Sequence, residues 1–412
     1  MKILQVNFTY NNGSTGKITY DIHTDLKKAG IDSIICYGRG KKTDEKNIYK
    51  VCDELYAHMN HLISRVTGIM YGGCFFSTNK LISVIKREKP DIVHLQCING
   101  YFVNIYKLLE WLKNNNILTV LTLHAEFMYT GGCAYTILCN KWTESTGCID
   151  CTEWRKKIDS TFFNRTADMW KRMKKAYDGF GKRLLVVSVS SWLMDRAKMS
   201  PMLKAYEHRV VMNGLDTNVF HPYSQDSAEK IKKELGIGKE KVIFHATPRF
   251  SDDEDHIKGG YYVLKLAQMM PDVKFVVAGD TEKNINAPKN VLFLGKISDQ
   301  TKLAELYSMA DMTLLTSRKE TFSMVTAETL CCGTPIVGFK AGAPEIIALK
   351  DYSEFVEHGN IEMLYSAAKR LLERNTDSTQ IAEQAKIYSK ETMTKKYIDI
   401  YKEFIEKNKT FC

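Results

Sequence analysis

Short apolar runs alternate along the chain with longer segments in which apolar residues recur at helical spacing. In the first half, the runs that predict buried strands are Lys2–Asn7, Ser33–Gly38, Ile92–Gln96, Leu118–His124 and Leu184–Ser190. In the second half they are Val242–Thr247, Val273–Gly279, Val291–Leu294, Met312–Thr316 and Pro335–Phe339. The amphipathic stretches between them include Ile18–Ala29 and Tyr106–Asn114. This alternation is typical of parallel sheets with crossover helices, so we expect an α/β protein with two doubly wound, Rossmann-like domains.

A segment rich in turn residues, Asn213–Asp226, lies at the midpoint of the 412-residue chain. A chain of this length suggests about two or three domains. We therefore predict a first domain over residues 1–212, a linker over 213–226 and a second domain that begins at 227. Ligands of such folds bind in the crevice at the carboxyl ends of the strands, so we expect the site there.

The composition narrows the class of protein. Hydrophobic residues make up 44% and charged residues 26%, which excludes a disordered or collagen-like chain. The net charge of +10 favours acidic partners such as nucleic acid, anionic lipid headgroups or phosphorylated substrates. Eleven cysteines, among them the adjacent Cys331 and Cys332, are a poor disulfide framework and favour a reducing, cytoplasmic compartment. We expect no signal peptide, and no apolar run approaches the roughly 18 residues that span a membrane.

Two glutamates follow the predicted strand Met312–Thr316. Glu320 lies just before a helix that we expect to begin near Thr321, and Glu328 lies about two turns into it. Backbone N–H groups around Phe322–Met324 would then face an anion at the positive end of the helix, which is a site for a diphosphate. The two carboxylates, roughly 12 Å apart along the axis, suit the hydroxyl groups of a sugar and of a ribose. The alternative is a dipole-complementing Glu320 and a solvated Glu328.

The sequence continues with Gly333-Thr-Pro and Gly342-Ala-Pro-Glu. The whole line closely resembles the donor-site signature of the retaining glycosyltransferases of family 4, in which a Glu-x7-Glu pair precedes Gly-Thr-Pro and Gly-x-Pro-Glu. Upstream, Arg249 and Lys258 resemble the paired diphosphate-binding cations of that family. The resemblance implies the GT-B fold, with a donor-binding domain at 227–390 and a closing helix at 391–412 that packs back on the first domain.

The first half carries Thr-Leu-His124 and, after a short aromatic run, Thr-Gly-Gly-Cys. This block resembles a branch of the family found among capsular, exopolysaccharide and colanic-acid-type transferases. The resemblance implies that His124 contacts the donor sugar and that Gly13 and Gly16 face the donor diphosphate and the acceptor. An ordinary strand–helix turn explains the two glycines equally well. The family commonly has Asp after the histidine; here that residue is Ala125, and Glu126 is a candidate replacement.

Four cysteines follow in a C-x5-C-x8-C-x2-C pattern, namely Cys133, Cys139, Cys148 and Cys151. One half of this pattern has metal-finger spacing, which makes a structural zinc ion a candidate. Four thiolates would leave no open coordination position, so such a zinc ion would not be catalytic. The alternative is four buried thiols, or thiols retained by an irregular loop within the insert 133–151.

The next segment, residues 153–183, carries ten Lys or Arg against four Asp or Glu, with aromatic residues interleaved. A basic, aromatic helix of this kind can lie on an anionic membrane surface, and Trp154, Phe162 and Trp170 would add burial at the headgroups if they share a face. Nucleic-acid binding or a simple solvated face are the alternatives.

Taken together, the resemblance implies a metal-independent hexosyltransferase that moves a sugar from a nucleoside-diphosphate donor with retention of configuration. The implied acceptor is a lipid-pyrophosphate-linked oligosaccharide at the inner face of a bacterial membrane, for surface polysaccharide synthesis. The implied catalytic residues are His124, Glu320, Arg249 and Lys258. The implied donor-binding residues are Gly13, Gly16, Gly279, Gly295, Thr321, Phe322, Ser323, Met324 and Glu328.

Two other functions remain open from the residues. A sugar-nucleotide epimerase has a similar fold but needs no lipid acceptor. A zinc-bearing nucleic-acid-binding protein would suit the positive charge and the cysteines, but it leaves the segment from Glu320 to Pro335 without a role. We therefore expect no nucleic acid among the partners. The residues do not select the base, the sugar or the linkage.

Overall fold

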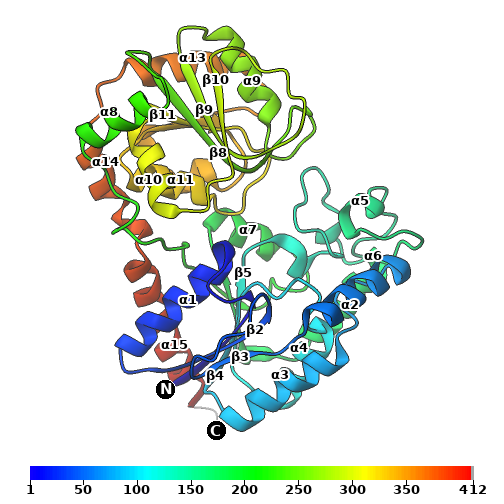
Figure 1. Cartoon of the computed structure of the whole chain (residues 1–412). Coiled ribbons are helices and arrows are strands. Elements are labelled where there is room, and N and C mark those ends of the chain that lie inside the picture. The colour runs from blue at the N-terminus through cyan, green and yellow to red at the C-terminus, as the bar shows by residue number, and fades with distance from the viewer. Residues whose placement is uncertain (410–412) are drawn as a thin grey trace. The chain divides into compact units, whose positions relative to one another are not determined.

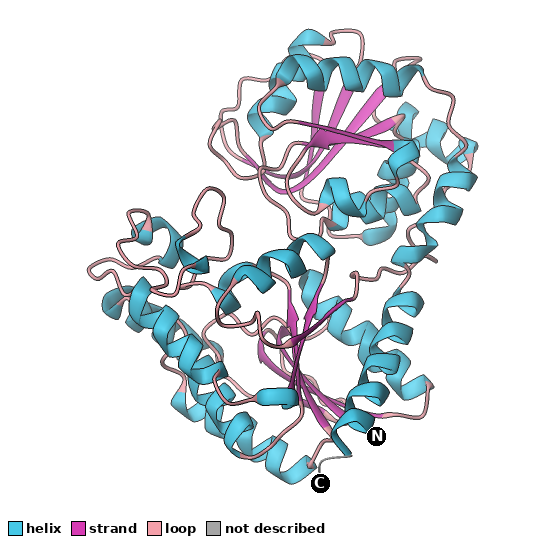
Figure 2. Cartoon of the chain, turned by 180° about the vertical axis from the view of Figure 1, so that it is seen from behind, coloured by secondary structure: helices cyan, strands magenta, loops and turns pink. Residues whose placement is uncertain are grey.

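The computed structural model describes residues 1–409, and it divides into two compact units (Figure 1). The first unit contains residues 1–212 together with the chain from residue 393 onward, and the second contains residues 213–392. Each unit is built on one parallel sheet. Figures 1 and 2 show helices on both faces of each sheet, which is the doubly wound arrangement that the alternating pattern predicts.

The sheet of the first unit has the strand order β3-β2-β1-β4-β5-β6-β7 within the described residues, and all of its pairings are parallel. Its strands are β1 (Lys2–Thr9), β2 (Asp32–Arg39), β3 (Ile48–Lys50), β4 (Ile92–Leu95), β5 (Thr119–Leu123), β6 (Leu184–Ser188) and β7 (Glu207–Val210). Their central side chains are buried because both faces are covered, so these strands appear in the sequence as continuous apolar runs.

The sheet of the second unit has the order β10-β9-β8-β11-β12-β13 within the same described range, again with parallel pairings. Its strands are β8 (Val242–Phe250), β9 (Lys274–Thr281), β10 (Val291–Gly295), β11 (Met312–Leu315), β12 (Ile336–Phe339) and β13 (Ser353–Val356). In both sheets the chain reverses its direction of travel beside the first strand, β1 or β8. The carboxyl ends of the strands at such a reversal form a binding crevice.

The helices complete the two layers around each sheet. In the first unit they are α1 (Gly13–Lys28), α2 (Glu54–Thr67), α3 (Phe75–Glu88), α4 (Ile105–Asn114), α5 (Trp154–Ile158), α6 (Thr166–Tyr177) and α7 (Ser191–Met199). In the second unit they are α8 (Gln225–Glu234), α9 (Gly260–Met269), α10 (Gln300–Met309), α11 (Met324–Cys331), α12 (Pro344–Ile347), α13 (Ile361–Glu373) and α14 (Ser378–Gln384). No helix among the described residues is both long enough and apolar enough to cross a membrane.

The last helix, α15 (Lys390–Lys409), packs on the sheet of the first unit. Its buried side chains include Tyr397 and Tyr401, which join a core cluster with residues of α1 and of β1, β4, β5 and β6. The Tyr401 hydroxyl lies 2.6 Å from His94 Nδ1, and His94 Nε2 lies 2.7 Å from the Thr122 hydroxyl. These contacts hold the helix where the resemblance places a closing helix. Residues 410–412 of the expected segment 391–412 lie outside the described residues.

Two details differ from the sequence predictions. The strands β3, β7 and β13 were not predicted, because each is a short sheet edge with half-exposed residues and no continuous apolar run. The segment 213–226, predicted as the linker between the domains, is part of the second unit. Its Leu215 pairs with Ser389, and its Asp216 forms an ion pair of 2.6 Å with Lys390.

The buried histidines predict how stability depends on pH. Burial lowers the pKa of His94 to about 3 and the pKa values of His23, His124 and His245 to about 4. These groups are neutral in the fold but become protonated in the unfolded chain below pH about 6.5. Their contribution to stability is therefore fully present above pH about 6.5 and is lost as the pH falls towards 4. Each contributes up to about 1.4 kcal/mol per pH unit over that range.

We expect the midpoint of urea unfolding to fall steadily between pH 7 and pH 5. In His94→Gln, the fall should be shallower. His58 is exposed, so His58→Gln is the matched control and should keep the wild-type slope. A midpoint that does not change between pH 7 and pH 5 would contradict this account of the buried histidines.

Candidate functional site

In the second unit, the structure brings Lys258 and Glu320 into direct contact. Lys258 follows β8, and Glu320 follows β11, the strand beside it in the sheet. The Lys258 ammonium donates to Glu320 Oε1 at 2.6 Å, and both side chains are largely shielded from water. Two strands that are far apart in sequence therefore place a cation and a carboxylate together at the carboxyl edge of the sheet. The sequence analysis assigned both residues to the same site.

Glycines allow this close approach. A Cβ atom on Gly259 would lie 2.2 Å from the carbonyl oxygen of Thr316, and a Cβ atom on Gly260 would lie 2.4 Å from that of Ser251. Gly259 also has a positive φ of 66°. The Thr316 hydroxyl donates to the Lys258 carbonyl at 3.0 Å and fixes the loop that carries the lysine. The two glycines are therefore required by the backbone packing around the Lys258 loop.

The turn after β12 holds Glu320 from the other side. The backbone N–H of Glu320 donates to the Ala341 carbonyl at 2.9 Å. The Glu345 carboxylate accepts from the backbone N–H groups of Ala341 and Gly342 at 2.9–3.1 Å. The Gly-x-Pro-Glu part of the sequence signature is thus a support for the glutamate. The sequence analysis included Glu345 in the signature but assigned it no role.

The helix after Glu320 begins later than the sequence predicts. The helix α11 starts at Met324 rather than near Thr321, and Ser323 is its N-cap. Ser323 has an unusual φ of 80°, and its hydroxyl accepts from the Thr326 N–H at 3.2 Å. Thr321 and Phe322 are buried in the preceding turn. The predicted start was wrong by one turn because the side-chain cap is provided by Ser323.

Glu328 lies in a pocket of about 310 Å³ near the carboxyl ends of β8 and β9. The Tyr307 hydroxyl donates to Glu328 Oε2 at 3.0 Å. Gly279 lines the same pocket, and a Cβ atom there would lie 2.3 Å from the Thr247 carbonyl oxygen, so this position also needs glycine. Gly295, with a φ of 70°, ends β10, and Lys296 after it lines the pocket. Tyr307 and Lys296 were not predicted.

Arg249 is the more exposed of the two predicted cations. Its guanidinium donates to Glu282 Oε1 at 2.9 Å and 3.1 Å, and the Ser251 hydroxyl donates to Glu282 Oε2 at 2.8 Å. These hydrogen bonds lower the pKa of Glu282, the one from Ser251 most of all. Glu282 was missed by the sequence analysis, since nothing in its sequence neighbourhood indicates that it contacts Arg249.

In the first unit, Gly13 and Gly16 lie at the start of α1, directly after β1. Gly13 has a φ of 66°, and a Cβ atom on Gly16 would lie 2.7 Å from the Thr9 hydroxyl. Gly13 lines a pocket of about 560 Å³ together with Tyr71 and Tyr101. The predicted glycine turn therefore borders a cavity large enough for part of a ligand.

His124 lies at the carboxyl end of β5, as predicted. Its Nε2 lies 2.9 Å from Gln96 Oε1, so the neutral ring donates from this nitrogen. Burial lowers the pKa of His124 to about 4, and the ring is therefore neutral at pH 7. The Gln96 side chain in turn contacts the buried side chains of Gln5 and His94. Gln96 was not predicted as a site residue.

Glu126 is a structural residue in this fold. It is fully buried, and Arg196 donates to its Oε1 at 2.5 Å. Its Oε2 accepts from the backbone N–H and the hydroxyl of Thr136 at 2.5 Å and 2.9 Å. The Tyr129 hydroxyl donates to Oε1 at 3.1 Å. These partners occupy both oxygens, so the hypothesis that Glu126 replaces the missing Asp at Ala125 is wrong.

The four cysteines of the insert keep free thiols. Burial, with a smaller contribution from the neighbouring thiols, raises the pKa values of Cys133 and Cys148 to about 12. The Gly131 N–H donates to the Cys148 sulfur at 3.2 Å. Over residues 1–409, no group of three or more His, Cys, Asp or Glu side chains is arranged to hold a metal ion. A structural zinc ion at Cys133, Cys139, Cys148 and Cys151 thus stays a prediction.

The basic aromatic segment divides into an inner and an outer set of residues. Trp170, Tyr177 and Phe180 are buried in the core. The Lys and Arg residues of α6 are exposed, and so are Phe162 and Phe163 before it. The condition that Trp154, Phe162 and Trp170 share one outer face is therefore not met, because Trp170 faces the core.

Comparison with known proteins agrees with this geometry. Residues 227–388 match the family described as Glycosyl transferases group 1. These residues form a group 1 glycosyltransferase domain. The matched residues include Lys258, Glu320 and Glu328. The family match therefore lies in the unit that carries the candidate donor site.

Two curated relatives show how far the similarity extends. The putative colanic acid biosynthesis glycosyl transferase WcaC of Escherichia coli K12 is 21% identical over 97% of this chain and 99% of its own. The N-acetyl-alpha-D-glucosaminyl L-malate synthase of Bacillus anthracis is 28% identical over 49% of this chain and 55% of its own. The chain thus spans about half the length of the second relative but nearly all of WcaC.

Solved structures match both units together. A glycosyltransferase from Rickettsia africae has a TM-score of 0.66 at 18% identity, covering 98% of each chain. Anabaena HepE in complex with UDP and glucose has a TM-score of 0.64 at 16% identity, covering 98% of this chain and 100% of its own. WaaG, a glycosyltransferase involved in lipopolysaccharide biosynthesis, has a TM-score of 0.61. These likenesses, with the two parallel sheets, confirm the GT-B fold.

The buried contact between Glu126 and Arg196 gives a stability prediction. Glu126→Ala would leave the largely buried Arg196 guanidinium and the buried Thr136 N–H without their acceptor, so we expect the unfolding free energy to fall by about 3 kcal/mol. Urea denaturation followed by circular dichroism measures this. Glu144 is exposed in the same insert, so Glu144→Ala is the matched control and should change stability little. Wild-type stability in Glu126→Ala would show that the ion pair is not a support of the insert.

Proposed function

We propose that the protein transfers a sugar from a nucleoside-diphosphate donor with retention of anomeric configuration. The observation that carries the proposal is the contact of Lys258 with Glu320 at the carboxyl edge of the second sheet, within the group 1 domain. A carboxylate accepts hydrogen bonds from sugar hydroxyls, and an ammonium offsets phosphate charge. The pair therefore lies where the sugar and the diphosphate of one donor would meet.

The proposed mechanism depends on electrostatic stabilisation. Negative charge develops on the departing diphosphate in the transition state, so fixed cations at that position lower the barrier. Lys258 and Arg249 supply the positive charge, and each is held in place by a carboxylate, Glu320 or Glu282. Glu320 orients the donor hexose. A contact between His124 and the donor sugar remains what the resemblance implies; Gln96 sets which ring nitrogen of His124 carries the proton.

The proposed nucleoside site is the pocket around Glu328. Glu328 accepts from Tyr307, and its carboxylate is the proposed acceptor for the ribose hydroxyls. Gly279 and Lys296 line this pocket, and Gly295 directly precedes Lys296 at the end of β10. Anabaena HepE was crystallised with UDP and with UDP-glucose, which supports a nucleotide sugar as the donor class.

The proposed acceptor is a lipid-linked oligosaccharide at the cytoplasmic face of a membrane. The names of WcaC and WaaG, which concern colanic acid and lipopolysaccharide biosynthesis, support a role in surface polysaccharide synthesis, such as a capsule or an exopolysaccharide. The tyrosine-lined pocket beside Gly13 in the first unit is the proposed acceptor side. Donor and acceptor would then be held by different units.

Thermal-shift measurements with UDP, GDP, ADP and dTDP test the proposal directly. A bound nucleotide stabilises the fold by an amount set by its concentration relative to Kd. We expect one of the four to raise the melting temperature saturably, and its sugar conjugate to be consumed only when an acceptor extract is present. No shift with any nucleotide would contradict the donor site. Nucleotide release without acceptor would favour the epimerase alternative.

Glu320→Ala and Lys258→Ala should each lower turnover by about 10²-fold or more, since each removes an electrostatic contact made in the transition state. Both should leave the melting temperature nearly unchanged. Lys265 is exposed on the neighbouring helix α9, so Lys265→Ala is the matched control and should retain full turnover. Steady-state assays with the donor identified above measure the effect. Near-normal turnover in either variant would remove that residue from the site.

We also propose that transfer needs no divalent metal, because Lys258 and Arg249 already carry the required charge. Activity should survive EDTA. Loss of activity on chelation, restored by Mg²⁺ or Mn²⁺, would contradict the proposal. Zinc content is measured alongside, since removal of a structural zinc ion would instead cause slow loss together with unfolding.

A further inference from the structure

The helix α2 of the first unit exposes its large apolar residues and buries its small and polar ones. Its buried side chains are Ala57, Asn60 and Ser64. Its exposed side chains include Leu55, Met59, Leu62, Ile63 and Val66, which are between 45% and 78% exposed. A helix that only covers a sheet has the opposite polarity, with its apolar stripe towards the core. The apolar side of α2 is therefore available to something outside the unit.

The exposed residues form one continuous stripe, which we call the α2 stripe. Positions 55, 59, 62, 63 and 66 are spaced by three, four or one residue, so they lie on one face of a helix. The helix has 14 residues and is therefore about 21 Å long. Single exposed apolar residues are common on proteins, but a row of five along one helix marks an interaction surface.

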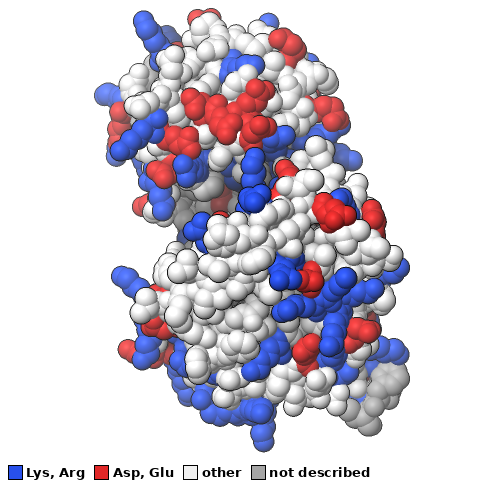
Figure 3. Space-filling view, turned by 90° about the vertical axis from the view of Figure 1, so that its right-hand side faces the viewer, with Lys and Arg blue, Asp and Glu red and all other residues white. Residues whose placement is uncertain are grey.

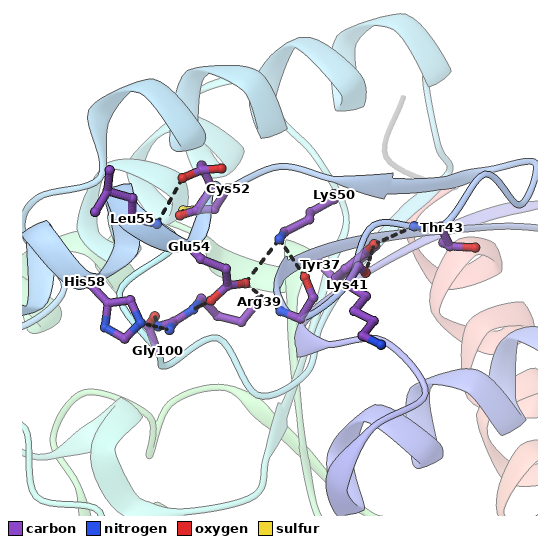
Figure 4. Close-up of polar contacts among 12 residues, drawn as sticks. Tyr37, Arg39, Lys41, Thr43, Lys50, Cys52, Glu54, Leu55, His58 and Gly100 are labelled. Atoms are coloured by element: carbon purple, nitrogen blue, oxygen red, sulfur yellow. Dashed lines mark hydrogen bonds and ion pairs between the residues drawn. The ribbon is translucent and has the colours of Figure 1, made fainter.

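Polar contacts fix α2 at its amino-terminal end, as Figure 4 shows. Glu54 accepts from Arg39 at 2.6 Å, from the Gly40 N–H at 2.7 Å and from Lys50 at 3.1 Å. Although partial burial acts in the opposite direction, these hydrogen bonds lower the pKa of Glu54 to about 2. In the same view Leu55 points away from this cluster. The orientation of the helix is thus set without its apolar face.

The buried side of α2 is fixed in the same way. Asn60 Oδ1 accepts from the Cys74 N–H at 2.7 Å. The ring of His61 stacks on Tyr101 with 4.5 Å between centroids. Tyr101 lines the pocket beside Gly13, which is the proposed acceptor side. One residue therefore links α2 to that pocket.

Aromatic residues extend the stripe at both ends. Phe76, at the start of α3, is 78% exposed and packs on Tyr56 of α2. At the other end the Thr161 N–H donates to the Arg65 carbonyl at 2.8 Å. This contact holds the exposed Phe162 and Phe163 next to the carboxyl end of α2. Rings at both ends would enter the headgroup layer together with the aliphatic row.

The charge of the chain lies in the same unit. Residues 1–212 carry 31 Lys and Arg against 19 Asp and Glu, whereas residues 213–412 carry 27 against 29. Figure 3 shows an extended white area on the first unit with Lys and Arg side chains along its border. Lys107 lies over the ring of Phe75, 5.7 Å from its centroid. A positive field around an apolar stripe complements an anionic bilayer.

We propose that the α2 stripe, with Phe76 and Phe162–Phe163, is the surface by which the protein docks on an anionic phospholipid membrane. The stripe enters the headgroup layer, and the surrounding Lys and Arg residues attract the lipid phosphates. A lipid-linked acceptor would then reach the pocket lined by Tyr101 from the membrane side. This last step rests on the proposed function, whereas docking itself does not.

A second copy of the chain fits this surface less well. A dimer formed through the stripe would bring two positively charged units together, and like charges repel. An anionic membrane replaces that repulsion with attraction. The stripe also lies on a single helix, which suits insertion between lipid headgroups.

Co-sedimentation with vesicles tests the docking surface. The stripe variant carries Leu62→Gln, Ile63→Gln and Val66→Gln, and the control carries Met199→Gln, Met363→Gln and Ile387→Gln, three residues with similar exposure. We expect wild type and control to bind phosphatidylglycerol-containing vesicles and to bind pure phosphatidylcholine vesicles more weakly. The stripe variant should partition at least about 10-fold less into both, since it loses apolar burial. Its nucleotide-induced thermal shift should be unchanged.

A third variant distinguishes the contribution of the α2 stripe to vesicle binding from that of the basic segment 153–183. Changing Arg155, Lys156, Lys171, Arg172, Lys174 and Lys175 to Gln should remove the preference for anionic vesicles but keep the weaker binding to phosphatidylcholine. The proposed docking surface is contradicted if the wild-type protein does not sediment with anionic vesicles, or if the stripe variant binds them as well as wild type does. It is also wrong if wild type is a dimer in light scattering and the stripe variant a monomer. Docking can fail in these ways while nucleotide binding persists.

Discussion

Parallel pairing of strands that are buried on both faces is the constraint on which this structure depends. Parallel strands need crossover connections, here helices that cover both faces of the sheet, and all carboxyl ends therefore meet at one edge. Residues that follow different strands are thereby brought together. Lys258 after β8 and Glu320 after β11 are 62 positions apart, and their side chains are 2.6 Å apart.

The close approach at that edge needs backbones without side chains. Gly259 and Gly279 each lie where a Cβ atom would meet a carbonyl oxygen within 2.4 Å. Such positions let neighbouring loop backbones pack directly against each other at the edge of the sheet. The carboxylate of Glu345 plays the complementary part, because it binds two backbone N–H groups in the turn that contacts Glu320. The chemistry of the site therefore depends on residues that do not themselves react.

The first unit uses charged and polar contacts differently. Glu126 binds Arg196 and Thr136 and so supports the insert 133–151. The ion pair of Arg39 with Glu54 fixes the amino-terminal end of α2. Because these contacts set the positions of the loops and of α2, the apolar side of α2 is not needed for folding. A surface that folding does not need can be kept for a partner. The positive charge of the same unit supports our proposal that this partner is an anionic membrane.

The sequence by itself determined the two-sheet α/β architecture and most of its strands, because fully buried parallel strands appear as continuous apolar runs. It also selected Glu320 and Glu328 as candidate site residues through their spacing, and Lys258 through the family resemblance. It did not determine the short edge strands, the start of α11 or the role of Glu126, since these depend on contacts between distant segments. Only the tertiary structure decided which side of α2 is buried: its spacing predicts an amphipathic helix, but its polar contacts with Arg39 and Cys74 turn the apolar side outward.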